Sequence, residues 1–149
     1  MKLRVRVFKT IAFFLVSLTV IGCSDLVLNK KSLNAFSESF IAANESRDVE
    51  AMLELFALED ADQKTINLLR IAVEFEIGLP IESLVFESLS GAPEEIINYT
   101  HNGISYEPSL KPKYRMKVQY DVEGQLASKY TLGRNIENDW RIVTAVPKN

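Results

Sequence analysis

Residues 113–120 read KYRMKVQY and alternate strictly between polar and apolar side chains. The period of two is typical of a β-strand with one face in a core and the other in solvent. The apolar face would consist of Tyr114, Met116, Val118 and Tyr120, and the opposite face of Lys113, Arg115, Lys117 and Gln119. This stretch predicts a half-buried strand with a basic outer surface, and an apolar layer that packs on its inner surface.

The alternation continues on both sides of this strand. After a turn at residues 121–124, Leu126, Tyr130 and Leu132 indicate the next strand, and a second turn at 135–139 leads to a last strand from Trp140 to Val146. Upstream, strands are predicted at 81–90, 96–100 and 104–107. Asn102-Gly103 separates the last two and favours a tight type I′ hairpin, which would place the single histidine, His101, at an exposed end.

Helical periods precede these strands. A first helix begins near Ser32, a second follows a break at 46–48 with Asp48 as its N-cap, and a third starts at Asp60 or Asp62 and stops at Gly78. The third helix has two neighbouring apolar stripes, from which we expect it to be largely buried. The stripes comprise Ile66, Leu69, Val73 and Ile77, and Leu68, Ala72 and Phe75.

Helices followed by an antiparallel meander predict an α+β fold, with the N-terminal helices packed on one face of a curved antiparallel sheet. Three short motifs lie in these elements: Arg47-Asp48-Val49-Glu50, Tyr130-Thr131-Leu132 and Trp140-Arg141-Ile142. With the helix order, they resemble the nuclear transport factor 2-like superfamily, which includes ketosteroid isomerase. The resemblance covers most of residues 32–146 and implies a cone with a pocket between helices and sheet. It does not by itself transfer a function.

The N-terminus has the organisation of an export signal. Lys2, Arg4, Arg6 and Lys9 precede an uncharged apolar segment at 11–22, which is short for a membrane-spanning helix of about 20 residues. Val20-Ile21-Gly22-Cys23 closes it and resembles the lipobox of bacterial lipoproteins. The resemblance implies cleavage before Cys23, a diacylglycerol on its sulfur and anchoring in a bilayer. The alternatives are an ordinary secretory signal with a stray cysteine, or a short uncleaved anchor.

The expected organisation is therefore a signal peptide at 1–22, a lipidated cysteine and tether at 23–31, and one domain at 32–149. In lipoproteins that resemble this one, Asp after the cysteine favours the inner membrane. Ser24 thus favours the periplasmic side of the outer membrane, although Asp25 follows. The mature chain would have 127 residues with 13 basic and 20 acidic side chains, a net charge of −7. Such an acidic domain lacks the excess of basic side chains that binding of nucleic acid requires.

Few residues are candidates for chemistry. Tyr114, Tyr120 and Tyr130 could line a pocket and donate to an oxyanion, as a ketosteroid-isomerase-type site requires, but no base matches that family's pattern. The competing interpretation is that these tyrosines are core residues. One histidine and one cysteine give weak support for a transition-metal site, and no phosphate-binding or nucleophile-elbow motif occurs. We expect no cofactor.

Charge is distributed unevenly along the chain. Residues 24–95 carry five basic and 15 acidic side chains, whereas residues 96–149 carry eight basic and five acidic ones. Lys113, Arg115 and Lys117 form a row that could meet anionic lipid, an acidic partner or a second copy of the chain, or could simply be a solvated strand face.

Three functions fit these observations. The first is a membrane-anchored, non-enzymatic domain that binds a protein partner or supports the cell envelope, and it is preferred. The second is a carrier or sensor for a small apolar ligand in the cone. The third is a ketosteroid-isomerase-like lyase or isomerase.

Overall fold

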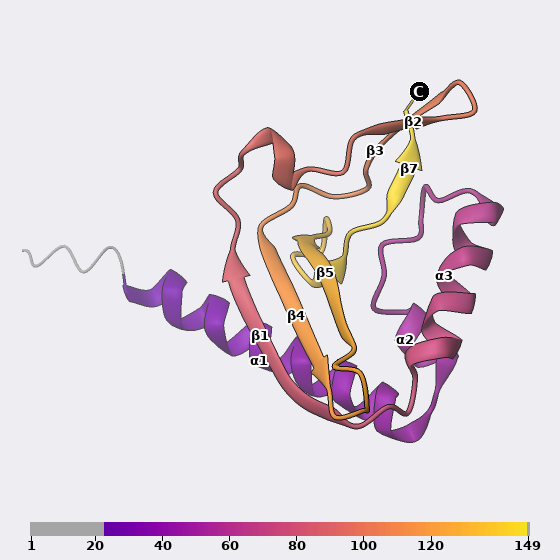
Figure 1. Ribbon diagram of the computed structural model, residues 1–149. Coiled ribbons are helices and arrows are strands. Elements are labelled where there is room, and N and C mark those ends of the chain that lie inside the picture. The colour runs from indigo at the N-terminus through magenta and orange to yellow at the C-terminus, as the bar shows by residue number, and fades with distance from the viewer. Residues whose placement is uncertain (1–22, 149) are drawn as a thin grey trace, which may run out of the picture.

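The computed structural model describes residues 23–148, with side chains from residue 32 onward. The predicted signal peptide at 1–22 and the side chain of Cys23 lie outside the described residues. Three α-helices precede seven strands in this part of the chain, which confirms the mixed α+β class (Figure 1). The helices are α1 (Cys23–Ser46), α2 (Val49–Leu53) and α3 (Gln63–Glu76); the strands are β1 (Ile81–Ser88), β2 (Tyr99–His101), β3 (Ile104–Pro108), β4 (Tyr114–Tyr120), β5 (Ala127–Arg134), β6 (Trp140–Ile142) and β7 (Ala145–Pro147).

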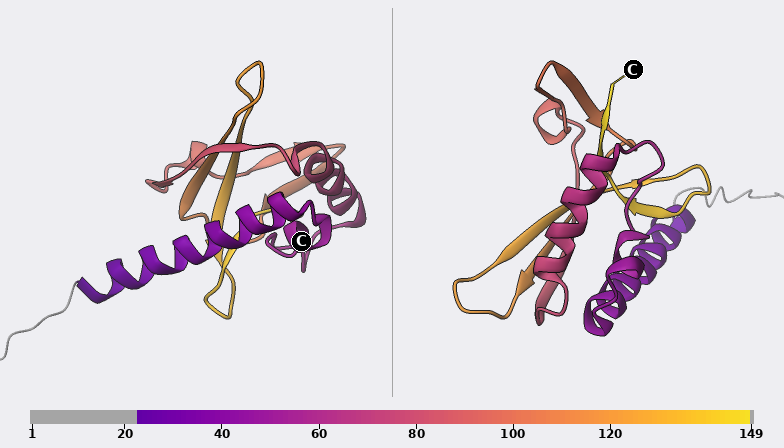
Figure 2. Two further views of the ribbon diagram at one scale, coloured as in Figure 1. Left: turned by 90° about the horizontal axis from the view of Figure 1, so that it is seen from below. Right: turned by 90° about the vertical axis from the view of Figure 1, so that its right-hand side faces the viewer.

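The larger sheet is antiparallel with the order β1-β4-β5-β6, and it is built around the strand that the alternating stretch predicted. Met116 lies opposite Phe86 of β1 and Tyr130 of β5, so apolar side chains from three strands share the inner face. Helix α1 runs beneath this sheet and α3 stands beside it (Figures 1 and 2). The core between them includes Phe40 of α1, which is buried together with Met116 and Val118.

The predicted strand from Trp140 to Val146 is wrong in one respect, because it is two strands in two sheets. Ile142 of β6 pairs with Leu132, whereas Val146 of β7 pairs with Glu107 in a second sheet of order β2-β3-β7. The buried Thr144 lies between them and donates its hydroxyl to the carbonyl of Ala57 at 2.5 Å. This side-chain bond holds the connection between the two sheets against the segment after α2.

The loop before β4 crosses close to the larger sheet at Gly133. A Cβ on this residue would lie 2.8 Å from Leu110 Cβ, 2.8 Å from the Lys111 carbonyl oxygen and 3.3 Å from Val143 Cγ2. Ordinary carbon contacts are near 3.5–4.0 Å, so a side chain cannot fit without movement of backbone. Glycine is therefore required here by the close approach of the loop.

In the smaller sheet, the predicted hairpin turn at Asn102-Gly103 is confirmed, but the bounds predicted for the strand before it are wrong. Asn102 and Gly103 have φ values of 51° and 78°, the positive values that a type I′ turn needs, and His101 is exposed beside them. The strand predicted at 96–100 begins later, at Tyr99, and ends at His101, because residues 96–98 form the irregular exit from a 3₁₀ turn at Pro93–Glu95. Glu95 accepts hydrogen bonds from the Gly91 and Ala92 amides, which hold that turn.

The predicted helix caps are confirmed, but the predicted burial of α3 is wrong. Asp48 accepts from the Ala51 amide and Asp62 from the Thr65 amide, and Gly78 has a φ of 81° just beyond the end of α3. Only Val73 of α3 is fully buried, and one of the two apolar stripes faces solvent. The helix packs on the core through the other stripe, with Val73 inside it and Leu69 and Ile77 against it. Residues 24–31, interpreted as a tether, have helical backbone and extend α1.

Candidate functional site

Glu76, the last residue of α3, reaches the inner face of the larger sheet and accepts three hydroxyl hydrogen bonds. The Tyr120 and Tyr130 hydroxyls donate to Oε2 at 3.0 and 2.5 Å, and the Ser128 hydroxyl donates to Oε1 at 2.6 Å. We call Glu76, Tyr120, Ser128 and Tyr130 the Glu76 cluster. It joins the end of a helix to two adjacent strands, and it contains two of the three tyrosines that the sequence singled out.

Burial and the nearby carboxylate raise the pKa of both tyrosines well above the ordinary value. For Tyr130 burial is the larger cause, followed by the hydrogen bond to Glu76; for Tyr120 burial again comes first, followed by the charge of Glu76. A phenol beside a carboxylate in a poorly solvated place keeps its proton, because ionisation would create a second negative charge there. Both tyrosines are therefore donors at neutral pH.

The geometry assigns the hydroxyl donors to the carboxylate and not to a substrate. A carboxylate has about four lone-pair positions, and three of those on Glu76 are occupied. A general base needs a lone pair aimed at the reacting proton, and an oxyanion hole needs donors that await the substrate oxygen. In the Glu76 cluster the three hydroxyls already donate to the Glu76 carboxylate. This arrangement suits a structural link between α3 and the sheet.

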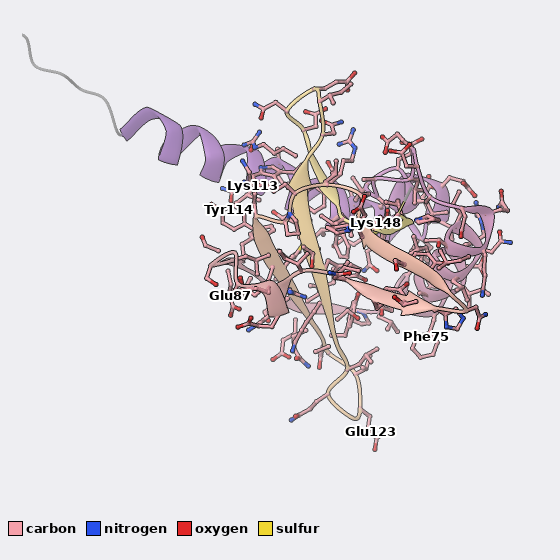
Figure 3. The ribbon with its side chains drawn as sticks, turned by 90° about the horizontal axis from the view of Figure 1, so that it is seen from above. Phe75, Glu87, Lys113, Tyr114, Glu123 and Lys148 are labelled. Atoms are coloured by element: carbon pink, nitrogen blue, oxygen red, sulfur yellow. The ribbon has the colours of Figure 1, made fainter. Side chains whose placement is uncertain are left out.

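Tyr114 does not join the other two tyrosines. Its ring packs edge-on against Trp140, with ring centroids 5.4 Å apart at 88° (Figure 3 shows Tyr114 at the start of β4). Trp140 is buried and donates its indole N–H to the Ser32 hydroxyl of α1 at 2.7 Å, while the Arg134 guanidinium lies 4.2 Å above its ring. The sequence could not separate Tyr114 from Tyr120, because both have the same strand phase but lie at opposite ends of β4.

A cavity of about 300 Å³ adjoins the Glu76 cluster, between α3 and the edge of β5. Its walls are mainly apolar, and Arg115, Lys129 and Glu76 supply charge. The apolar lining comprises Phe56, Leu69, Ala72, Val73, Ile97, Ile142 and Val143. This volume lies at the lower limit for small-molecule sites.

The basic row on β4 is only partly a set of free cations. Lys117 forms an ion pair with Glu87 of β1 at 2.6 Å, and Arg115 donates to the Glu95 carbonyl at 3.5 Å. Lys113 is exposed at the beginning of the strand (Figure 3). Lys117 also lies directly opposite Lys129 of β5, an unfavourable pair that the Glu87 carboxylate offsets.

A groove of about 840 Å³ lies between α1 and β1, and sequence reasoning missed it. We call it the β1 groove. From α1 it is lined by Asn34, Ser37, Ile41 and Glu45, and from the strand side by Glu82, Leu84 and Phe86, among others. It depends on how α1 is placed against a strand 40 residues later, so no local pattern could indicate it.

Asn44 fixes one end of the β1 groove. This buried side chain accepts from the Gly78 amide at 3.0 Å and donates to the Leu79 carbonyl at 2.9 Å, so it ties α1 to the turn that starts β1. Arg47 lies against Gly78, where an added Cβ would be 2.6 Å from Arg47 Nε. The groove is thus bounded by an anchored turn.

Strand β1 is at the end of its sheet, so one of its edges has no partner strand among the described residues. The Leu89 amide donates to the Lys113 carbonyl, and in an antiparallel pair the backbone direction alternates from residue to residue. Continued along the register, the amides and carbonyls of Leu84, Phe86 and Ser88 point away from β4. The groove is therefore lined by a strand whose outward backbone groups have no partner strand within residues 23–148.

The described residues contain no group of three or more side chains suited to hold a metal ion. Within residues 23–148, no helix combines the length and the apolar character that a membrane crossing needs. No protein-family model matches the chain. A search of curated proteins likewise gives no significant match.

Proposed function

We propose that this chain is a membrane-anchored lipoprotein whose domain, a nuclear transport factor 2-like cone, binds a protein partner without catalysing a reaction. The observation that carries the proposal is the β1 groove beside an unpaired strand edge. Addition of an extended segment to such an edge is a common mode of peptide recognition, in which backbone hydrogen bonds give affinity and side-chain pockets give specificity.

The chemistry of the groove suits an extended protein segment. Leu84 and Phe86 combine outward backbone groups with partly buried apolar side chains, and Ile41 adds an apolar surface from α1. Glu45 and Glu82 supply negative charge at the rim. An incoming strand with alternating apolar residues and a basic flank would complement these groups.

Anchoring is the second half of the proposal, and it rests on the lipobox resemblance at Val20-Ile21-Gly22-Cys23. Acylation of Cys23 would hold the domain on the periplasmic side of the bilayer, with Ser24 favouring the outer membrane. Helix α1 begins at Cys23 and leads to the domain, so the anchor would lie at the end of a helix of 24 residues.

A small apolar ligand in the cavity beside α3 is a second candidate, supported by the apolar lining and volume of about 300 Å³. An isomerase of the ketosteroid-isomerase type is less well supported. The nearest carboxylate, Glu76, already accepts from Tyr120, Ser128 and Tyr130.

The test places a photo-crosslinking amino acid at Glu82, in the groove, or at Glu123, in the β4–β5 turn, within the full chain in living cells. We expect a protein adduct at position 82 and none at 123. Ser88→Pro should abolish the adduct, because proline removes an outward amide while the ladder bonds to β4 remain. Equal adducts at both positions, no adduct at 82, or an adduct that survives Ser88→Pro would each refute the proposal.

A further inference from the structure

Helix α3 exposes an apolar stripe that its own domain does not use. Leu68, Ile71 and Phe75 are 58, 62 and 72% exposed, and their spacing of three and four residues places them on one face. We call these three residues the α3 stripe. Single exposed apolar residues are common, but three large ones aligned on a helix mark an interaction surface.

The helix cannot rotate to bury this stripe. At its start Asp62 accepts from the Thr65 amide at 2.6 Å, and at its end Glu76 accepts from three hydroxyls of the sheet. In its middle, Arg70 forms two hydrogen bonds to the Glu50 carboxylate of α2, at 2.5 and 3.1 Å. The stripe therefore faces outward. Helix α3 lies at the front in the right-hand view of Figure 2, and Figure 3 places Phe75 on the far side of the domain from Tyr114.

The charges along the stripe favour a second copy of the same helix. Lys64 lies one turn before Leu68 on the stripe, and Glu74 flanks its other end. A two-fold axis between Leu68 and Ile71 would set the two α3 helices antiparallel, with Lys64 of each copy beside Glu74 of the other. Helix dipoles are also favourably opposed in that arrangement.

An anionic bilayer is a poorer occupant. Residues 24–95, which contain all three helices, carry 15 acidic and five basic side chains. This excess of negative charge repels acidic head groups. In the proposed dimer, Lys64 of one copy and Glu74 of the other neutralise each other.

We propose that two copies of this chain associate through antiparallel α3 helices, with the α3 stripe of each in the contact. A contact of one helix per copy, of 14 residues, is small for a protein interface, so the dimer should be weak in dilute solution. Confinement of both copies to a membrane would favour it by raising their effective concentration, a benefit that rests on the proposed anchor. The contact itself does not depend on the β1 groove.

The test uses oxidative cross-linking of the full chain in intact cells, with Ile71→Cys near the proposed axis and Val85→Cys as a comparably exposed control on β1. Val85 is 51% exposed. The unsubstituted chain, whose one cysteine is Cys23, shows how much cross-linking Cys23 itself gives. We expect a disulfide-linked homodimer at position 71 only, identified by mass spectrometry as two copies. Phe75→Glu should reduce its yield at least tenfold, and Ser88→Pro should leave it unchanged.

A charge exchange tests the geometry. Lys64→Glu in the Ile71→Cys chain should weaken cross-linking, and Lys64→Glu with Glu74→Lys should restore it. Absence of a dimer at position 71, equal yields at 71 and 85, an adduct to a different protein, or no rescue by the double exchange would overturn the proposal. Because Ser88→Pro alters the outer edge of β1 and not α3, failure of the dimer and failure of the proposed partner site are distinguishable.

Discussion

Glu76 is the residue on which the packing of α3 against the sheet depends most directly. Its carboxylate is the common acceptor for hydroxyls from β4 and β5, and it lies at the end of the helix where a negative charge is opposed by the helix dipole. The hydroxyl donors offset that unfavourable position. Removal of one donor should therefore weaken the join between helix and sheet.

Tyr130→Phe keeps the ring, which packs edge-on against Phe40 and Phe56, but removes one hydrogen bond to Glu76. We expect a loss of about 1–3 kcal/mol in the free energy of unfolding at neutral pH, measured by urea denaturation. Tyr99→Phe, at a half-exposed ring stacked on Tyr106, is the matched control and should change stability by under about 0.5 kcal/mol. Equal effects of the two variants would contradict the role of the cluster.

The raised pKa of Tyr130 also predicts the direction of an alkaline effect. The folded state keeps this proton where the unfolded chain, with an ordinary pKa of 10.0, loses it. The hydroxyl's contribution is complete below the unfolded pKa and declines as the pH rises above it. In the same urea series, the parent should therefore lose more stability than Tyr130→Phe between neutral pH and about pH 11.

The sequence singled out the hydrogen-bond donors Tyr120 and Tyr130 but not their acceptor, Glu76. Tyr120 and Tyr130 lie on the apolar faces of adjacent predicted strands, so their convergence followed from strand phase. Glu76 ends a helix 44 residues before Tyr120, and nothing in its local sequence distinguishes it from Glu74, which is exposed. Only the tertiary placement of α3 decides which of the two carboxylates meets the sheet.

Among the elements, α3 illustrates how capping sets the limits of a helix while packing sets its exposure. Asp62 satisfies the first turn, and its pKa is lowered chiefly by the hydrogen bond from the Thr65 amide. The stabilisation that ionised Asp62 gives the folded state is therefore present above its unfolded pKa of 3.8. It is lost as the pH falls through the lower pKa that Asp62 has in the folded state.

Asp62→Asn should retain the cap but remove its titration, since asparagine also accepts at this position. We expect the melting temperature of this variant to fall less than that of the parent between about pH 5 and pH 2. Asp60→Asn, two residues earlier and outside the cap, should follow the parent. Identical acid profiles for Asp62→Asn and the parent would show that the cap does not contribute to acid sensitivity.

Periodicity predicted which elements exist better than it predicted which ones pair. The alternation around β4, the hairpin at Asn102-Gly103 and both helix caps depend on neighbouring residues, and all are present. The division of 140–146 between two sheets comes with a contact between Thr144 and the Ala57 carbonyl across 87 residues, which no local pattern indicates. Which stripe of α3 faces outward likewise depends on how the helix packs on the core, with Val73 inside it.

For the whole molecule, the central proposal is attachment to a bilayer through Cys23. Cys23→Ala in the full chain should abolish labelling by an alkyne fatty acid and move the protein from the membrane pellet to the soluble fraction. Ser24→Ala, one residue later, should keep both properties.

Persistent labelling of Cys23→Ala, or an unlabelled parent chain, would contradict lipid attachment. The second result would favour an ordinary secretory signal. Neither result would alter the proposed groove or the pairing of α3, because both are built from residues 34 and beyond.

Gly133 has a consequence for the chain's relatives. The loop before β4 passes so close to this residue that even a methyl group would meet Leu110 and Lys111 at 2.8 Å. Any chain that shares this crossing must either keep the smallest residue at that position or reroute the loop. A relative that carries alanine there should therefore differ in the spacing of its two sheets, so this one position can serve as a marker when distant members of the lineage are sought.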